Sequence, residues 1–313
     1  MSYYQKINYD LVVILGPTAT GKTRLSVYLA DQLKGEIISA DSRQVYRGMD
    51  IGTGKDLREY ELKETNIPYH LIDISDPQEE YNVFQYQKDF QAAIAYIRSQ
   101  QKLPILCGGT GFYIKAILMD FHLPPVRPNK KLRQKLENFK LDDLIQKLES
   151  IAPGASNHNL IDTKRRVIRA IELAMSNQKE KKGERIISHD SRFKIQNPIV
   201  IGIAFEREVI RERITERLHQ RLNQGMIKEV ELLLKNGITH ERLENLGLEY
   251  RFISHYLQNQ FTLDEMTEKL NTAIHQFAKK QMTFFRNMEK NGIKIHWISE
   301  GDIKKALDYI LKE

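Results

Sequence analysis

Short apolar runs alternate with amphipathic stretches through the first third of the chain. Leu11–Leu15 is a continuous apolar run, and similar runs follow at Glu36–Ala40, Tyr69–Asp73 and Leu103–Cys107. Between the last two, Val83–Ser99 repeats its apolar residues at helical spacing. Runs of this length predict buried strands, and strands that alternate with helices predict a parallel, doubly wound α/β sheet.

The pattern changes at a proline-rich stretch, Phe121–Pro128, beyond which the chain has a mainly helical pattern. Ile199–Ala204 then returns as a strand, and the remainder is again mainly helical. We therefore predict a core with additional C-terminal helices and an inserted all-helical module. The core is expected at residues 1–119 and 197–313, and the insertion at residues 120–196.

The turn after the first predicted strand has the spacing of a phosphate-binding loop. Gly16-Pro17-Thr18-Ala19-Thr20-Gly21-Lys22-Thr23 stands between that strand and a helical pattern. The glycines allow a tight turn whose N–H groups point inward, and the helix start adds partial positive charge. Lys22 can reach a terminal phosphate, and Thr23 can hold Mg²⁺ that bridges phosphate oxygens. This context predicts a P-loop NTPase-like core with a polyphosphate site; the alternative is a structural turn that only opens a helix.

Composition narrows the class of protein. The 313 residues are 41% hydrophobic and 28% charged, which is typical of a soluble globular protein, and the formal net charge is +7. An excess of this size is compatible with nucleic-acid binding without establishing it. Cys107 is the single cysteine, which excludes intrachain disulfides and a cysteine-built zinc site.

Nothing in the hydrophobic pattern predicts a membrane protein. No apolar stretch is long enough to span a bilayer, and Met1–Asp10 is polar without the apolar core of a signal peptide. We therefore expect a cytoplasmic protein with no membrane partner. Nothing in the sequence indicates an obligate dimer, so we expect a monomer.

Two polar clusters follow predicted strands, at the edge where open α/β sheets bind ligands. Asp41 could accept a proton from a nucleophile or help hold a metal ion. An Asx turn or a helix cap explains Asp41 equally well, and both interpretations stay open here. Gly108–Gly111 closes another strand: its glycines allow a backbone or a flat ring to approach, and Thr110 adds a hydroxyl. A tight strand-to-helix turn is the alternative.

Two sets of arginines each share one helix face. They are Arg165, Arg166 and Arg169 in the insertion, and Arg213, Arg217 and Arg221 in a later helix. Glutamates accompany the later row, so a solvated, salt-bridged surface is the favoured interpretation there. Arg207 lies just after the returning strand, and for that reason we expect it to hold phosphate.

A late segment, Phe277–Arg286, mixes basic and aromatic residues. Such mixtures suit RNA, although a helix with an aromatic core face and solvated lysines is the favoured interpretation of the segment alone. The phosphate-binding loop by itself first suggests an ATP-dependent kinase. Such an enzyme needs a carboxylate after an apolar strand to organise Mg²⁺, and Asp73 is a weak candidate for it. A pure binding module is a third possibility, and no guanine-specificity signal is present.

The motifs, taken in order, resemble one family over nearly the whole chain. They are the loop at 16–23, Ile-Ser-Ala-Asp-Ser-Arg-Gln-Val-Tyr at 38–46, Gly-Met-Asp-Ile-Gly-Thr at 48–53, Gly-Gly-Thr-Gly at 108–111, Arg-Arg-Val-Ile-Arg-Ala-Ile-Glu at 165–172 with the arginine-rich helix from 207, and Lys-Lys-Gln-Met-Thr-Phe-Phe-Arg at 279–286. This set is similar to bacterial tRNA dimethylallyltransferases. The resemblance implies transfer of a dimethylallyl group from dimethylallyl diphosphate to N6 of the adenosine 3′-adjacent to the anticodon in tRNA.

The resemblance also implies a role for each motif. Gly16, Pro17, Thr18, Ala19, Thr20, Gly21, Lys22 and Thr23 would hold the diphosphate, with Mg²⁺ at Thr23. Asp41 would accept the proton lost from the amino nitrogen, and Arg207 would clamp the diphosphate. The tRNA contacts would come from Asp41, Ser42, Arg43, Gln44, Thr110, Arg165, Arg166, Arg169, Lys279, Lys280, Gln281 and Arg286. The insertion would close over the tRNA, and this argues against the related possibility of a free adenine nucleotide as acceptor.

The sequence departs from the family pattern at a few positions. Thr20 replaces a usual serine and keeps the hydroxyl, whereas Asp56 stands where a proline is common. Leu246–Arg251 differs from the glycine-tyrosine-arginine run of many members, so a tRNA contact there is carried over only weakly. Phe284 stands where tryptophan is common.

Overall fold

A computed structural model describes residues 7–62, 66–121, 126, 128–155, 163–180 and 195–312. The chain divides into two compact units, one formed by Met1–Phe121 with Arg192–Glu313 and the other by His122–Ser191. These limits lie close to the boundaries of 119/120 and 196/197 expected from the sequence. Residues 181–194, the end of the expected insertion, lie outside the described residues. Each unit is described by itself.

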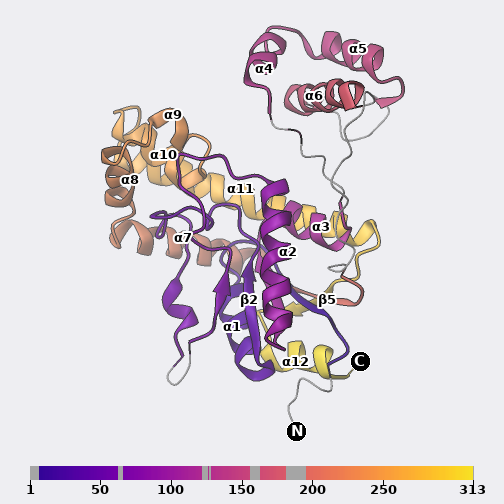
Figure 1. Ribbon diagram of the computed structural model, residues 1–313. Coiled ribbons are helices and arrows are strands. Elements are labelled where there is room, and N and C mark those ends of the chain that lie inside the picture. Colours follow the sequence, from indigo (N-terminus) through magenta and orange to yellow (C-terminus); the bar gives the residue numbers. More distant parts are fainter. Residues whose placement is uncertain are drawn as a thin grey trace. The chain divides into compact units, whose positions relative to one another are not determined.

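Within the described residues, the first unit is built on one parallel sheet of six strands, which confirms the predicted α/β class (Figure 1). The spatial order is β3-β2-β4-β1-β5-β6. The strands are β1 (Leu11–Leu15), β2 (Gly35–Ser39), β3 (Tyr69–His70), β4 (Leu103–Gly108), β5 (Pro198–Ala204) and β6 (His296–Ser299). The central strand β1 pairs on both sides, with Val13 opposite Leu106 of β4 and Val200 of β5.

Strand β3 is shorter than the apolar run that predicted it. The run extends to Asp73, but pairing stops at His70 because Leu71 and Asp73 have φ values of 63° and 56°. This left-handed conformation is unfavourable for side chains other than glycine and cannot continue a strand. The residues after His70 therefore form a turn that passes close to the 44–47 segment, where Asp73 N–H donates to Gln44 O at 3.1 Å.

Helices cover both faces of the sheet because the strand residues alternate between two cores. Val12 and Ile14 belong to the core under α1 (Lys22–Leu33) and α12 (Ile303–Lys312), whereas Val13 and Leu15 belong to the opposite core. The opposite core lies under α2 (Val83–Ser99), α3 (Gly111–Leu118) and part of α11 (Leu263–Lys290). The result is a three-layer unit. Because the strands are parallel, the loops that follow β1, β2 and β4 leave the sheet at the same edge.

A third core of the same unit lies among the C-terminal helices. It is formed by α7, α8, α9, α10 and α11 together with the residues after β2. The bounds of these helices are Arg207–Asn223 for α7, Met226–Lys235 for α8, His240–Leu243 for α9 and Leu248–Leu257 for α10. A short 3₁₀ helix, η2 (Leu57–Tyr60), precedes β3. This packing places α7 and α11 beside the phosphate-binding loop, a neighbourhood that periodicity alone does not reveal.

The elements described in the second unit are all helices. The helices α4 (Lys130–Leu136), α5 (Leu141–Ile151) and α6 (Lys164–Glu180) surround a small apolar core that includes Leu144, Leu148 and Val167. Glu172 of α6 is almost fully buried and accepts hydrogen bonds from Arg133 at 2.8 and 2.9 Å and from Arg169 at 3.1 Å. Burial raises the pKa of Glu172, but these bonds outweigh it and the pKa is lowered overall.

Glu172→Gln is expected to destabilise this unit by about 2 kcal/mol, because two arginines lose their charged partner. A carboxyl with a lowered pKa in the folded state stabilises above its ordinary value of 4.5, and this contribution is lost as the pH falls below that value. Hydrogen exchange of the α6 amides, followed as a function of pH, measures both effects. Asp142→Asn, which neutralises an exposed carboxylate in the same unit, is the control; equal protection in both variants would contradict the assignment.

Among the described residues, no helix is both long enough and apolar enough to cross a membrane.

Candidate active site

The loop between β1 and α1 has the shape that an anion site requires. Ala19 and Gly21 have φ values of 63° and 76°, which turn the chain sharply into the first turn of α1. Thr20 Oγ1 and Lys22 Nζ both donate to Pro17 O, at 2.8 and 2.7 Å, so the loop curls around its own lysine. The chain therefore directs a helix N-terminus and one ammonium group at the same point.

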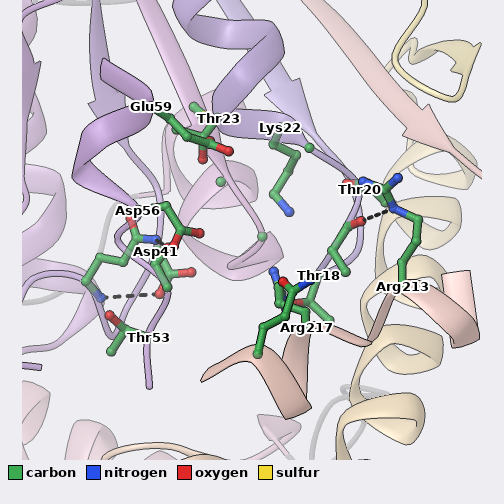
Figure 2. Close-up of a pocket in the computed structure, with 18 of the residues that line it drawn as sticks. Thr18, Thr20, Lys22, Thr23, Asp41, Thr53, Asp56, Glu59, Arg213 and Arg217 are labelled. Carbon is green, nitrogen blue, oxygen red and sulfur yellow. Dashed lines mark hydrogen bonds between the residues drawn. The ribbon is translucent and has the colours of Figure 1, made fainter. Parts of the chain in front are cut away.

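A cavity of about 290 Å³ opens in front of this loop (Figure 2). Its walls come from the loop, from the ends of β2 and β4, from the 53–60 segment and from α7. The lining residues are Thr18–Thr23, Asp41, Gln44, Thr53, Gly54, Asp56, Glu59, Tyr60, Cys107–Gly109, Arg213, Glu216, Arg217 and Gln220. Gly16 and Pro17 of the expected diphosphate set lie outside this lining, and Pro17 O accepts the bonds from Thr20 and Lys22.

Two arginines of the α7 row, Arg213 and Arg217, line the cavity and the third, Arg221, is buried, so the interpretation of the row as a solvated surface is wrong. Arg213 Nε donates to Ala19 O at 2.9 Å, and Arg217 Nη2 donates to Thr18 Oγ1. Arg221 is only 7% exposed and pairs with Asp56 at 3.4 Å. The sequence shows only the spacing of the row; the packing of α7 beside the loop decides which way it points.

Three basic side chains, Lys22, Arg213 and Arg217, line the cavity. Burial lowers the pKa of Lys22 to about 8, against opposing contributions from Cys107 and Asp41. Burial, together with the neighbouring Arg221, lowers the pKa of Arg217 to about 10. An anion in the cavity would relieve both effects, because it replaces lost hydration and offsets the repulsion between cations. The electrostatics therefore favour a multiply charged anion such as a diphosphate.

Asp41 lines the cavity and also makes the turn that the sequence left open. Its Oδ1 accepts the backbone N–H groups of Arg43 at 2.8 Å and Gln44 at 3.4 Å, which is an Asx turn. Within the described part of the chain, Oδ2 accepts no hydrogen bond. The two interpretations are therefore compatible, since one oxygen fixes the side chain while the other is available to a ligand.

Acidic residues that the motifs did not identify line the same cavity. Asp56 and Glu59 come from the 53–60 segment and line the cavity together with Thr23 (Figure 2). Burial, followed by the nearby Asp56, raises the pKa of Glu59. For Asp56 the only sequence signal was its place where the family has proline; for Glu59 there was none.

Side-chain hydrogen bonds tie the segment after β2 to the turn that follows β4, to β2 itself and to the 48–56 loop. Thr110 Oγ1 accepts the Ser42 N–H at 3.0 Å, and Gln44 bonds to Ser39 Oγ at 3.1 Å and to Gly54 O at 3.0 Å. Ser42, Arg43 and Thr110 lie next to Asp41 but outside the cavity lining.

The glycines of the Gly108–Gly111 motif are required by the protein's own packing. A Cβ on Gly108 would lie 2.3 Å from Ala40 O, and one on Gly111 would lie 2.4 Å from the Phe284 ring. The sequence predicted that these glycines let a backbone or a flat ring approach. In the structure the backbone is that of Ala40 and the ring is that of Phe284, both from the protein itself.

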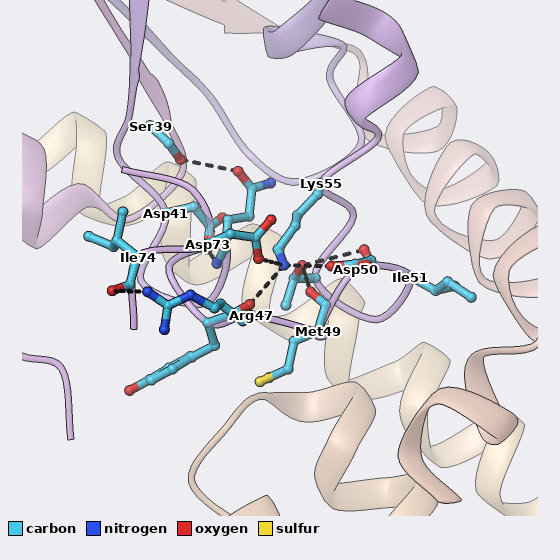
Figure 3. A network of polar contacts seen from close by, with 12 residues as sticks. Ser39, Asp41, Arg47, Met49, Asp50, Ile51, Lys55, Asp73 and Ile74 are labelled. Atoms are coloured by element: carbon cyan, nitrogen blue, oxygen red, sulfur yellow. Dashed lines mark hydrogen bonds and ion pairs between the residues drawn. The ribbon is translucent and has the colours of Figure 1, made fainter. Parts of the chain in front are cut away.

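Lys55 lies at the centre of the polar network in Figure 3. It is 1% exposed, and its Nζ donates to Tyr46 O at 2.7 Å, to Asp50 Oδ1 at 2.6 Å and to Asp73 Oδ1. These bonds hold the 48–56 loop, which supplies Thr53 and Asp56 to the cavity. Asp73 is thus committed to Lys55 and does not line the cavity, so the kinase interpretation loses its magnesium carboxylate.

The remaining expected residues fall into distinct places. Arg207 is exposed at the first residue of α7 and does not line the cavity. Lys279, Lys280 and Arg286 are exposed on α11, whereas Gln281 is buried and bonded to Thr18 and Gly109, so it is not an accessible tRNA contact.

The second unit carries the other expected tRNA contacts. Arg165 and Arg166 are exposed on α6, and Arg169 is half-buried between Glu172 and Val126 O.

Comparison with known proteins identifies the family. Residues 44–288 match the family described as IPP transferase. The chain belongs to this family. The tRNA dimethylallyltransferase 1 of Geotalea uraniireducens (strain Rf4) is 48% identical over 308 residues, with 97% of each chain covered. The tRNA dimethylallyltransferase 2 of Porphyromonas gingivalis (strain ATCC BAA-308 / W83) is 50% identical over 288 residues, which cover 92% of this chain and 93% of that protein.

A solved structure extends the agreement to the fold. The crystal structure of the full-length tRNA isopentenylpyrophosphate transferase from Bacillus halodurans has 34% identity and a TM-score of 0.67, covering 96% of this chain and 94% of that one. The resemblance expected from the order of the motifs is confirmed, and so is a P-loop NTPase-like core. The family is one of prenyl-transferring enzymes.

Proposed function

We propose that this protein transfers a dimethylallyl group from dimethylallyl diphosphate to N6 of the adenosine 3′-adjacent to the anticodon in tRNA and releases diphosphate. The observation that carries the proposal is the pairing of two groups across one cavity. A cationic P-loop lies on one side, and the carboxylate of Asp41 lies on the other. Membership of the IPP transferase family supplies the prenyl chemistry.

The donor half of the site holds the leaving group. The loop amides, Lys22 and Arg217 bind the diphosphate, and Arg213 extends the same cationic wall. Stabilising the negative charge that develops on the diphosphate lowers the barrier to breaking its bond to the allylic carbon. Arg213 and Arg217 take the role that the sequence suggested for Arg207, because they reach the loop and Arg207 does not.

Mg²⁺ fits the donor half as a partner of the diphosphate. Thr23 offers a hydroxyl inside the cavity, which Glu59 also lines. No group of three or more His, Cys, Asp or Glu side chains among the described residues could hold a metal ion. Phosphate oxygens would therefore complete the coordination, as is usual for this ion. When bound, the ion neutralises charge on the departing diphosphate.

The acceptor half removes a proton. The adenine N6 attacks the allylic carbon, the carbon–oxygen bond to the diphosphate breaks, and the surplus proton of N6 passes to Asp41 Oδ2. The Asx turn at Oδ1 holds the carboxylate in place during this transfer. Ser42, Arg43, Gln44 and Thr110 would receive the flipped-out base: Gln44 lines the cavity, and the other three lie next to Asp41.

The RNA itself needs a larger basic surface than this cavity offers. Lys279, Lys280 and Arg286 on α11 are exposed and would contact phosphates, as would the exposed Arg165 and Arg166 on α6. Residues 120–196 would act as the module that closes over the tRNA, and the protein would act as a monomer in the cytoplasm. A free adenine nucleotide would use none of these surfaces.

One assay separates the candidate functions. The protein is incubated with dimethylallyl diphosphate, Mg²⁺ and unmodified tRNA, and the nucleosides are analysed by mass; parallel reactions contain AMP or ATP in place of tRNA. We expect prenylated adenosine only in the tRNA reaction. Prenylated nucleotide without tRNA would favour the free-nucleotide alternative, and phosphate transfer from ATP without prenylation would overturn the proposal.

Arg165→Ala is expected to weaken tRNA binding and to reduce the slope of log K against log salt by about 1, the change for one lost phosphate contact. Filter binding between low and moderate salt measures the slope. Lys147→Ala removes one exposed positive charge from α5 of the same unit and is the matched control. An unchanged slope for Arg165→Ala, or an equal reduction in both variants, would remove the α6 arginines from the RNA contact.

A further inference from the structure

Helix α11 carries one buried polar side chain among exposed basic residues. Gln281 is 8% exposed, whereas its neighbours Lys279 and Lys280 are exposed. A buried amide is costly unless its donor and acceptor both find partners. The position of Gln281 therefore points to a definite internal role.

Both ends of the Gln281 amide are bonded to the site. Its Oε1 accepts the Thr18 N–H of the P-loop at 2.9 Å, and its Nε2 donates to Gly109 O at 2.8 Å. A Cβ on Gly109 would lie 2.5 Å from Nε2, so the glycine makes room for this amide. One side chain thus joins the phosphate-binding loop to the turn that follows β4.

The connection continues to the acceptor side. The residue after Gly109 is Thr110, whose N–H donates to Ala40 O at 3.1 Å and whose Oγ1 accepts the Ser42 N–H at 3.0 Å. Ala40 and Ser42 flank Asp41 in the chain. The hydrogen bonds of Gln281 therefore complete a continuous chain of hydrogen bonds and backbone from the phosphate-binding loop to Asp41, the proposed base.

We infer that Gln281 is a positioning residue that keeps the phosphate-binding loop at a fixed distance and orientation from Asp41. The inference rests on the proposed function and deepens it. Prenyl transfer needs the amine nitrogen aligned with the breaking carbon–oxygen bond, and small misalignments have large costs in rate. An allylic carbon that is not met by the amine is met by water: the bond to diphosphate breaks, a bond to the water oxygen forms, and a proton goes to solvent. The products are then dimethylallyl alcohol and diphosphate.

The test compares Gln281→Leu, which removes both hydrogen bonds, with Gln281→Glu, which keeps an acceptor for Thr18 and loses the donor to Gly109. Gln276→Leu, an exposed change on the same helix, is the matched control. Each variant is measured for tRNA affinity, for single-turnover transfer with saturating donor, and for the ratio of dimethylallyl alcohol to prenylated adenosine. The second Gln281 variant preserves the test if the first does not fold.

For Gln281 variants that bind tRNA with wild-type affinity, we expect transfer to fall by about 10²-fold. The ratio of alcohol to prenylated adenosine is expected to rise, while Gln276→Leu resembles the wild type. A merely structural role would lower transfer and hydrolysis together and leave the ratio unchanged, which would overturn the inference. Wild-type transfer and ratio in both Gln281 variants would also overturn it. If the wild-type protein makes no prenylated adenosine, the proposed function fails instead.

Discussion

Asp41→Asn is expected to lower the single-turnover rate of prenyl transfer by about 10²- to 10⁴-fold, the range for loss of a positioned general base. Asparagine is nearly isosteric and can still accept the Arg43 and Gln44 N–H groups through Oδ1, so the Asx turn persists. What is lost is the oxygen that can take a proton from N6. The tRNA affinity is expected to stay within a few-fold of wild type.

Rapid-quench single turnover with saturating donor and tRNA measures this rate, and filter binding measures the affinity. The control is Asp76→Asn, because Asp76 Oδ1 also accepts a backbone N–H two residues later, from Gln78 at 2.8 Å, outside the cavity. That variant is expected to keep the wild-type rate. Unchanged turnover in Asp41→Asn would remove Asp41 from the role of base.

Arg217→Ala is expected to lower kcat/KM for the donor by about 10²- to 10³-fold, as removal of one strong donor to a developing anion does elsewhere. Arg217 reaches the P-loop at Thr18 and is held in a crowded cationic environment that an anion stabilises. Because the interaction strengthens as charge moves onto the leaving diphosphate, kcat should fall as well as donor affinity.

The matched control lies on the same helix. Arg207→Ala removes an equal charge from an exposed position outside the cavity and is expected to change kcat/KM by less than about threefold, in keeping with a screened, solvent-exposed charge. Steady-state kinetics with varied dimethylallyl diphosphate distinguishes the two arginines. A large loss in Arg207→Ala with little change in Arg217→Ala would restore the assignment made from the sequence and refute the one made from the structure.

The local chemistry of the site was readable along the chain wherever a few consecutive residues define it. The P-loop spacing at 16–23 specifies a turn into a helix N-terminus, and the Asp-Ser step at 41–42 specifies a polar turn after a strand. Both follow from backbone geometry within a short segment, so no distant contact was needed to anticipate them. The alternation of apolar runs likewise predicted the parallel sheet, which the structure confirms.

The residues that contact the phosphate-binding loop and line the cavity come largely from distant parts of the chain, and the sequence analysis assigned most of them wrongly or did not identify them. Arg217 lies 199 residues from Thr18, and Gln281 lies 263 residues from it. Asp56 and Glu59, which line the cavity, follow Lys55, whose bonds to Tyr46 and Asp50 hold the preceding loop.

The sequence by itself determined the parallel α/β class, the anion-binding loop, the acidic turn beside it and, through the order of its motifs, the family. Only the tertiary structure decided which arginines face the loop, that Asp73 serves Lys55, and that Gln281 is internal. The physical reason is that a periodic row on a helix fixes which residues share a face but not what that face meets. The direction of the face is set by the packing of α7 and α11 against the third core, and this depends on the whole chain.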